Sequence, residues 1–293
     1  MATIEELKHK IATAKDLNSV VKTMKAVAAV SIRQYEKAVE SLTEYDRTLE
    51  IGLQILLRNQ PEILLKQSST VDGRIGIIVF GSDWGMCGQF NERVVEYIQE
   101  NQENWSINAD DCFILALGSR VCDRLEATGH KCEACFTLPS SIGKITSTIQ
   151  EMVLILETWR QQNQVNRIIV IYNRILNGAT YNSTGLQIFP LNFQWLKKLH
   201  QQQWRSNSLP TFTMNKDKLA AALFRQYFFV SLYRACAESL KSEHSSRLAA
   251  MQMAEKNIAE RLTKLNMEFN HQRQTIITEE LFDIVSGFEA LTD

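Results

Sequence analysis

One glycine-rich stretch has the residue types and position of a phosphate-binding loop. Residues 81–88 read Gly-Ser-Asp-Trp-Gly-Met-Cys-Gly, and they follow an apolar run and precede a stretch with helical spacing. A phosphate group can bind at such a strand-to-helix junction, on the helix N-terminus. The stretch is neither G-x-G-x-x-G nor a P-loop, since no Gly-Lys-Ser/Thr follows. We therefore interpret it as a tight turn that needs glycine, and we expect the isolated chain neither to bind nor to hydrolyse ATP.

The cysteines and histidines offer the other candidate chemistry. Cys132 and Cys135 have C-x-x-C spacing, but no second pair completes a zinc site, and a thioredoxin-type motif would open a helix rather than enter a strand. They are interpreted as incidental, and all six cysteines as reduced thiols. The five histidines share no ligand spacing and are His9, His130, His200, His244 and His271. We predict no catalytic residue, no metal site and no cofactor.

The composition limits what kind of protein carries these residues. The chain has 293 residues, with 32 Lys+Arg against 33 Asp+Glu, so the basic excess of a dedicated nucleic-acid binder is missing. Its apolar runs fall short of the roughly 18 residues of a membrane-spanning helix. Acids at Glu5 and Glu6, without an apolar segment behind them, do not resemble a secretory signal. We expect a soluble, intracellular chain.

Glycine and proline divide the chain into three parts. The first 60 residues hold no proline and only Gly52, and the residues after Pro210 hold no proline and only Gly287. Because proline costs a helix interior about 3 kcal/mol and glycine about 1 kcal/mol, both ends are predicted to be long helices. The expected domains are an N-terminal helix over 1–60, an inserted domain and connector over 61–209, and a C-terminal helix over 210–293.

Apolar residues at alternating steps of three and four support a coiled coil. The N-terminal series runs from Leu17 to Leu56 and the C-terminal series from Leu248 to Ile276. The C-terminal pattern then resumes at Ile277, one residue out of phase. Each stripe needs a partner, so we predict that the two ends wind around each other. The alternative is that each end folds separately onto the middle domain.

The middle of the chain is predicted to be α/β. The runs 74–80, 112–117, 135–138, 168–172 and 186–191 are expected strands, and residues 92–100, 121–128 and 142–161 are expected helices. This alternation indicates βαβ units and a mostly parallel sheet. The predicted fold class is a long antiparallel two-helix coiled coil with an inserted α/β domain.

Four segments resemble the gamma subunit of rotary F-type ATP synthases. Residues 242–251 (SEHSSRLAAM) are similar to its S-E-x-x-x-R-M-x-A-M signature, and residues 270–287 to its N-x-x-R-Q-x-x-I-T-x-E-L-x-E-I-V-S-G ending. Residues 10–29 resemble its N-terminal stretch, and residues 82–91 (SDWGMCGQFN) its S-D-R-G-L-C-G-G-F-N loop. Together these matches extend over essentially the whole chain.

The resemblance implies a non-catalytic rotor shaft that couples ion flow through the membrane ring to ATP synthesis or hydrolysis. Its implied partners are the alpha and beta subunits, the epsilon subunit and the c-subunit ring, with no nucleic acid and with the membrane reached only through the complex. The implied place is the cytoplasmic face of a bacterial plasma or thylakoid membrane. In this family the beta subunits carry out catalysis, and the inserted α/β domain is Rossmann-like and binds no nucleotide.

The resemblance also implies contact residues. Arg247, Gln274 and Thr278 match positions that contact the beta subunits, and Met24 and Lys25 match positions beside the moving beta segment. Because the apolar stripe of the same helix includes Leu248 and Met251, we also expect Arg247 to point outward from the coil. An apolar tip would turn in the bearing of the hexamer, and its residues are Ile277, Leu281, Ile284, Phe288 and Leu291.

The sequence also departs from the family pattern. Trp84 stands in place of a basic residue, Gln89 in place of glycine and Leu248 in place of methionine. The stretch between Pro190 and Pro210 is too short for the regulatory insertion of chloroplast forms. These departures are consistent with a divergent second-copy enzyme, such as the sodium-type branch. A stand-alone coiled-coil adaptor and a dithiol or nucleotide-binding α/β enzyme stay as alternatives.

Overall fold

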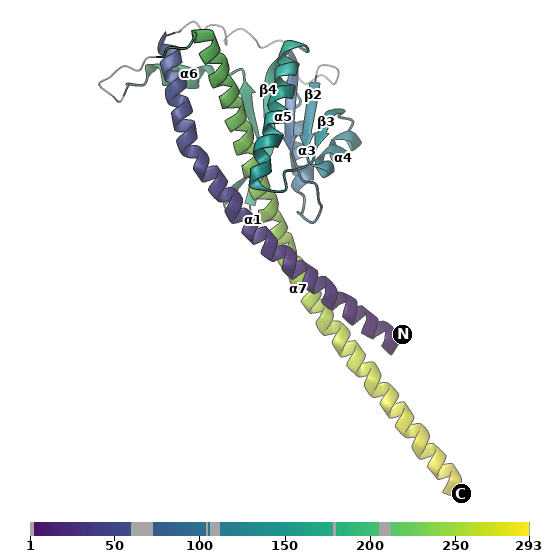
Figure 1. Ribbon diagram of the computed structural model, residues 1–293. Helices are drawn as coiled ribbons and strands as arrows, with labels where there is room; N and C mark the ends of the chain where they lie inside the picture. The colour runs from purple at the N-terminus through teal and green to yellow at the C-terminus, as the bar shows by residue number, and fades with distance from the viewer. Residues whose placement is uncertain are drawn as a thin grey trace. The chain divides into compact units, whose positions relative to one another are not determined.

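Figure 1 shows the computed structural model of the chain. It describes residues 3–59, 73–103, 105, 112–177, 180–204 and 212–292, without the side chains of 177 and 287–292. The chain divides into two compact units. The first contains residues 1–28 and 247–293, and the second contains residues 29–246.

Two long helices begin and end the described chain. Helix α1 covers Ile4–Asn59, and helix α7 covers Lys216–Thr292, so both predicted terminal helices are confirmed. Just before helix α7 begins at Lys216, the side chain of Asn215 accepts a hydrogen bond from the backbone N–H of Asp217 at 2.9 Å. A short polar side chain at this position satisfies a donor that the first helical turn leaves unpaired.

In the first unit, α1 and α7 form the predicted antiparallel coil. Leu7 and Ile11 of α1 form one buried cluster with Leu265, against which Leu262 and Phe269 also pack. The stripe predicted from Leu248 to Ile276 is buried or half-buried along its length. The coil therefore follows from the heptad pattern, and burying these apolar side chains is its main source of stability.

The second unit continues the pairing of α1 with α7. Two ion pairs, Asp46 with Arg234 and Glu36 with Lys241, join later residues of α1 to earlier residues of α7. The ring of Tyr35 stacks on His244 at 5.7 Å between ring centroids. The predicted α1 stripe is buried or half-buried here except at Tyr45, which is 43% exposed.

The second unit is built on one five-stranded sheet with the order β3-β2-β1-β4-β5. The strands are β1 Arg74–Phe80, β2 Cys112–Leu117, β3 Cys132–Phe136, β4 Val165–Asn177 and β5 Thr180–Phe189. Strands β3, β2, β1 and β4 are parallel, whereas β5 pairs with β4 antiparallel. The prediction of a mostly parallel sheet is confirmed, and all five predicted strands overlap observed ones.

Four shorter helices complete the second unit: α3 Phe90–Asn101, α4 Ser119–Ala127, α5 Ile142–Gln161 and α6 Phe193–Gln201. Sequence reasoning predicted the first three of these helices and missed α6. Asn192 caps the N-terminus of α6, because its side chain accepts hydrogen bonds from the backbone N–H groups of Gln194 and Trp195. Helix α6 packs with Leu49, Leu53 and other α1 residues in a small apolar cluster.

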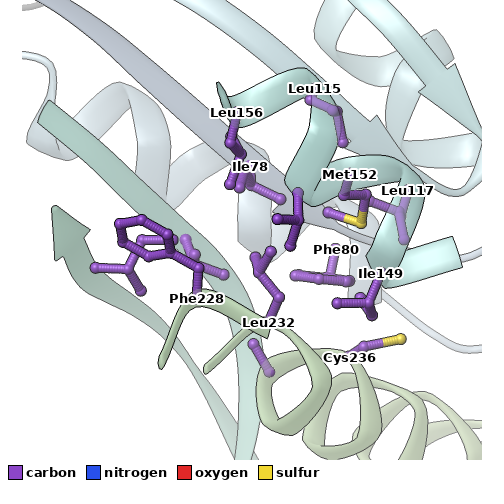
Figure 2. Close-up of a cluster of buried hydrophobic side chains, with 14 of the residues drawn as sticks. Ile78, Phe80, Leu115, Leu117, Ile149, Met152, Leu156, Phe228, Leu232 and Cys236 are labelled. Carbon is purple, nitrogen blue, oxygen red and sulfur yellow. The ribbon is translucent and has the colours of Figure 1, made fainter. Parts of the chain in front are cut away.

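The sheet separates two apolar layers because successive residues of a strand face opposite sides. Ile78 and Phe80 of β1 face α5 and α7 (Figure 2), in a cluster that includes Ile149, Met152 and Leu232. The alternate residues of β1 form a second cluster with α3 and α4. Helix α7 is thus partly a core helix of the α/β unit, although its sequence pattern suggested only a coiled-coil strand.

Candidate functional site

The loop between β1 and α3 is held together by its own polar groups. The side chain of Asn91 accepts a hydrogen bond from the backbone N–H of Ser82 at 2.9 Å and donates to the Ser82 hydroxyl at 2.8 Å. The Ser82 hydroxyl in turn donates to the carbonyl of Trp84 at 2.9 Å. Met86 and Gly88 have φ angles of 61° and 63°, in the left-handed region that glycine adopts readily.

Asp83 lies at the helix end where an anion could otherwise bind. Its Oδ1 atom accepts from the backbone N–H of Ser119, the first residue of α4, at 2.9 Å, and its Oδ2 atom accepts from the N–H of Leu138 at 2.8 Å. A carboxylate at a helix N-terminus satisfies free N–H groups and interacts favourably with the helix dipole. The protein's own carboxylate therefore occupies the N-terminus of α4, and the loop fits the interpretation of a structural turn.

The same loop is attached to the long helix α7. The hydroxyl of Ser246 donates to the carbonyl of Cys87 at 2.6 Å, and both residues are buried. On the sheet side, Asn173 of β4 donates to the carbonyl of Phe90 at 2.8 Å. Trp84 remains 76% exposed and Met86 55% exposed. The loop thus joins α7 to the carboxyl end of the sheet while presenting two large apolar side chains to solvent.

A polar cluster fixes α7 to strand β4. The hydroxyl of Tyr172 donates to Oε2 of Glu238 at 2.9 Å, and Nε of Arg174 lies 3.4 Å from the same oxygen. Burial, and then the neighbouring Glu238 carboxylate, raise the pKa of Tyr172 far above its ordinary value. The tyrosine therefore stays neutral and keeps donating this bond throughout the physiological range. The bond joins the helix to the α/β unit in a fixed position.

The outward orientation expected of Arg247 is wrong. Arg247 is only 9% exposed. The prediction treated α7 here as a helix with one apolar stripe and a solvated back, but Ser242, Glu243, Ser245 and Ser246 just before it are also buried. When a helix is buried on several sides, residues outside its apolar stripe need not face solvent. The heptad argument therefore does not apply to this segment.

The other expected contact residues are more accessible. Gln274 and Thr278 are exposed and lie one helical turn apart on α7, with the Thr278 hydroxyl donating to the carbonyl of Gln274 at 2.8 Å. Met24 is half-buried, and Lys25 is in an ion pair with Glu255 of α7 at 2.5 Å. This lysine lowers the pKa of the Glu255 carboxyl, first through their hydrogen bond. Part of the charge of Lys25 is therefore already compensated within the coil.

The apolar C-terminal part of α7 is exposed. Ile277 is 49% exposed, Leu281 58% and Ile284 73%, and the neighbouring Phe282 and Val285 are exposed as well. Within the first unit, this part of α7 continues beyond the start of α1 (Figure 1), so in the part of the chain that the structure describes α1 does not cover its apolar side chains. The predicted tip residues Phe288 and Leu291 belong to the same helix, but their side chains lie outside the described residues.

Sequence reasoning missed one covalent link in the second unit. Cys122 of α4 and Cys135 of β3 form a disulfide, which contradicts the expectation that all six cysteines are reduced thiols. The C-x-x-C spacing gave no hint of this pair, because Cys122 lies 13 residues before Cys135 and reaches it only once α4 packs beside β3. Asp83 and Ser246 were missed for the same reason, since their partners are distant in sequence.

Among the described residues, no helix is long and apolar enough to cross a membrane. The architecture is that of a two-helix coiled coil with an α/β domain inserted between its helices. A family model described as ATP synthase matches residues 3–291. The chain therefore belongs to the ATP synthase family.

The relatives identify the subunit. The chain is 28% identical over 304 residues to the ATP synthase gamma chain of Pelagibacter ubique, covering 99% of this chain and all of that protein. It is 25% identical over 295 residues to the gamma chain of Buchnera aphidicola, covering all of this chain and 99% of that protein. The role predicted from the sequence is confirmed: this is the gamma subunit type, the non-catalytic central stalk of F-type ATP synthase.

Solved structures agree on the fold. A chain of the rotor of the Euglena gracilis mitochondrial ATP synthase in rotational state 1 superposes with a TM-score of 0.62 at 18% identity, covering 94% of this chain and 98% of that chain. At this level of identity the likeness concerns the fold alone, and it includes both long helices and the inserted domain.

Proposed function

We propose that the coil of the first unit turns as a shaft inside a hexamer of alpha and beta subunits. An asymmetric rod can stabilise a different conformation of each beta subunit around it, and rotation then exchanges these conformations. The chain itself supplies no catalytic group in this scheme. It contributes by making different contacts with each beta subunit, so the exposed residues of the coil are the candidates for these contacts.

Gln274 and Thr278 are the strongest candidates for contact with the beta subunits. Both are exposed, and residues four apart lie on the same face of a helix, so one partner loop can reach the two together. Arg247, Met24 and Lys25 complete the proposed contact set. Because Arg247 is buried, a beta subunit can contact it only at the accessible edge of its guanidinium group or after the residues around it move apart.

The single observation that carries the proposal is the exposed apolar tip. Ile277, Leu281, Phe282, Ile284 and Val285 are all large, apolar and at least 45% exposed within two to three turns of one helix. Such a patch on a water-facing helix is typical of a surface that another protein covers. The tip, with Phe288 and Leu291, is proposed to turn in an apolar bearing formed by the hexamer.

The remaining partners are assigned to the inserted domain of the second unit. The inserted domain is proposed to contact the epsilon subunit and the c-subunit ring, and through them the membrane. The proposed place is the cytoplasmic face of a bacterial plasma or thylakoid membrane. Relatives of this chain are gamma chains, and a solved structure similar to it belongs to a central stalk with a c-ring.

The test compares contact variants in the assembled complex. Gln274→Ala with Thr278→Ala should lower ATP-driven ion uptake by inverted membrane vesicles, because each neutral hydrogen bond contributes about 0.5–1.5 kcal/mol. Adding Arg247→Ala should lower uptake further, since a charge-assisted bond contributes about 1.5–3 kcal/mol. Lys264→Ala, at an exposed position of the same helix, is the matched control and should leave uptake unchanged.

Folding and assembly must be measured alongside uptake. Arg247→Lys keeps the charge and removes the planar fork, so it separates bidentate recognition from simple charge at this buried site. Co-purification of alpha and beta subunits reports assembly for every variant. Uptake and ATP turnover that stay at the wild-type level in the assembled triple variant would show that these positions do not carry the contact.

A further inference from the structure

Three cysteines of the second unit lie together at one edge of the sheet. The sulfur atoms of Cys122, Cys132 and Cys135 are all within 4.8 Å of one another, and Cys122 and Cys135 form the disulfide. The Cα atoms of this pair are 6.3 Å apart, within the usual range for a disulfide. Neither the fold nor the shaft role requires a disulfide here, so the cluster needs its own explanation.

A bulge in the edge strand brings the two cysteines of β3 to the same helix. Cys132 lies opposite Ile114 of β2, but the next residue of β2, Leu115, lies opposite Ala134, so β3 contains one extra residue. Residues three apart in a regular strand point to opposite faces, and one inserted residue reverses this parity. Both sulfurs can therefore approach Cys122, which lies on α4.

The two sulfurs of the disulfide differ in accessibility. Cys122 is 6% exposed and belongs to the core between α4 and the sheet, whereas Cys135 is exposed. Cys132 is half-buried, and burial together with the Glu126 carboxylate raises the pKa of its thiol to about 11. A thiol that is protonated near neutral pH is a poor nucleophile, so Cys132 does not readily displace either bonded sulfur.

We propose that the Cys122–Cys135 disulfide is a redox modification site that an external dithiol opens at the exposed sulfur of Cys135. One thiolate of the dithiol attacks the Cys135 sulfur, and the Cys122 sulfur leaves and takes up a proton. The second thiol of the reductant then releases Cys135 as a thiol. The dithiol is oxidised to its own disulfide, two electrons and two protons pass to the protein, and Cys132 keeps its thiol throughout.

The position of the disulfide gives the modification a structural consequence. It joins α4 to β3, and Asp83 joins the start of α4 at Ser119 to Leu138, just beyond the end of β3. Once the disulfide opens, the start of α4 and the end of β3 stay joined by this side-chain bridge and by the hydrogen bond that the backbone N–H of Gly118 donates to the carbonyl of Phe136 at 2.8 Å. The loop that supplies Asp83 is the one that Ser246 of α7 holds through Cys87. Reduction therefore loosens the support of a loop that contacts the long helix.

The test uses the purified full-length chain and dithiothreitol as the dithiol. The chain is equilibrated in mixtures of reduced and oxidised dithiothreitol, quenched with acid, alkylated and digested with trypsin. In the oxidised mixtures we expect the peptide Val121–Arg124 linked to the peptide Cys132–Lys144, with fragmentation placing the link at Cys135. In the reduced mixtures the linked species should be lost, and both peptides should be alkylated.

Variants assign the roles of the three sulfurs. Cys132→Ser should retain the redox-dependent link, whereas Cys122→Ser should abolish linkage between these two peptides. Hydrogen exchange over α4 and β3 should become faster on reduction of the wild-type chain and should not respond to dithiothreitol in the Cys122→Ser/Cys135→Ser double variant. A normal unfolding transition in each variant excludes a simple folding defect.

Three results would overturn the proposal. One is full alkylation of Cys122 and Cys135 in the most oxidised mixture. Another is a link that fragmentation places at Cys132, which would make Cys132 the bonded partner. The third is one tightly held zinc ion per chain with no linked peptide, because three thiolates at this spacing can also bind a soft metal ion.

Discussion

Removal of the Asp83 carboxylate should destabilise the second unit without altering the coil. The carboxylate accepts three hydrogen bonds: from the backbone N–H of Ser119 at 2.9 Å, from the Ser119 hydroxyl at 3.3 Å and from the N–H of Leu138 at 2.8 Å. Asp83→Ala removes all three and leaves the first turn of α4 without its cap. Asp83→Asn keeps one carbonyl oxygen as an acceptor and removes the charge.

The magnitude follows from the two backbone bonds. A helix cap contributes about 1 kcal/mol, and a hydrogen bond to a charged group about 1.5–3 kcal/mol. Because Asp83 is half-buried, water can replace some of the lost hydrogen bonding in the variant. We therefore expect Asp83→Ala to lower the free energy of unfolding by about 2–4 kcal/mol. For a unit of this size the melting temperature should fall by roughly 2–4 °C for each kcal/mol. Asp83→Asn should show about half of this loss.

Tryptophan fluorescence is the appropriate assay because all five tryptophans lie in the second unit, and Trp159 is among its most deeply buried side chains. Urea titration followed by fluorescence therefore reports that unit alone. Far-ultraviolet circular dichroism, which also detects the coil, serves as the comparison. A loss below about 0.5 kcal/mol for Asp83→Ala, the range of ordinary surface substitutions, would refute the idea that the carboxylate holds the loop, α4 and the end of β3 together.

Two further predictions concern the coil and alkaline pH. Leu265→Ala, at a position only 3% exposed in the coil, should cost about 2–4 kcal/mol, seen by circular dichroism but not by tryptophan fluorescence. Lys264→Ala should have little effect on the circular dichroism or the fluorescence transition. An equal loss of stability in Lys264→Ala and Leu265→Ala would contradict the burial of Leu265 in the coil. Burial, followed by Cys236 and Glu243, raises the pKa of Tyr35 to about 12. A tyrosine whose pKa is raised by folding stabilises the fold at pH values below its ordinary pKa near 10, and this contribution is lost as the pH rises toward 12. The free energy of unfolding measured in urea should therefore fall over that pH range. It should fall less in the Tyr35→Phe variant, which lacks the titrating hydroxyl.

Periodicity alone was sufficient for the two long helices and their pairing. The absence of proline over 1–60 and after Pro210, with apolar residues at heptad spacing, requires long helices whose stripes cover each other. The pattern succeeded because α1 and α7 pair through local, repeated contacts. It failed at Arg247, where burial depends on more than one stripe, and the exposure of a helix residue cannot be deduced from its own helix.

The α/β domain was predictable in outline for a similar reason. Strands buried on both faces appear as continuous apolar runs, and the alternation with helical stretches requires parallel pairing. The strand order, the antiparallel β5 and helix α6 were not predictable. These features depend on which strands pair although they are far apart in the sequence. Chains with the same apolar pattern can differ in that pairing.

The sequence by itself determined the family, the shaft helices and the class of the inserted domain, because each is written in residues that are close together along the chain. Only the tertiary structure decided which side chains meet: Asp83 with Ser119 and Leu138, Ser246 with Cys87, and Cys122 with Cys135. These partners lie on different elements, and hydrogen bonds and disulfides form only when packing brings two groups within a few ångströms. The spacing of residues in the sequence carries no measure of that distance.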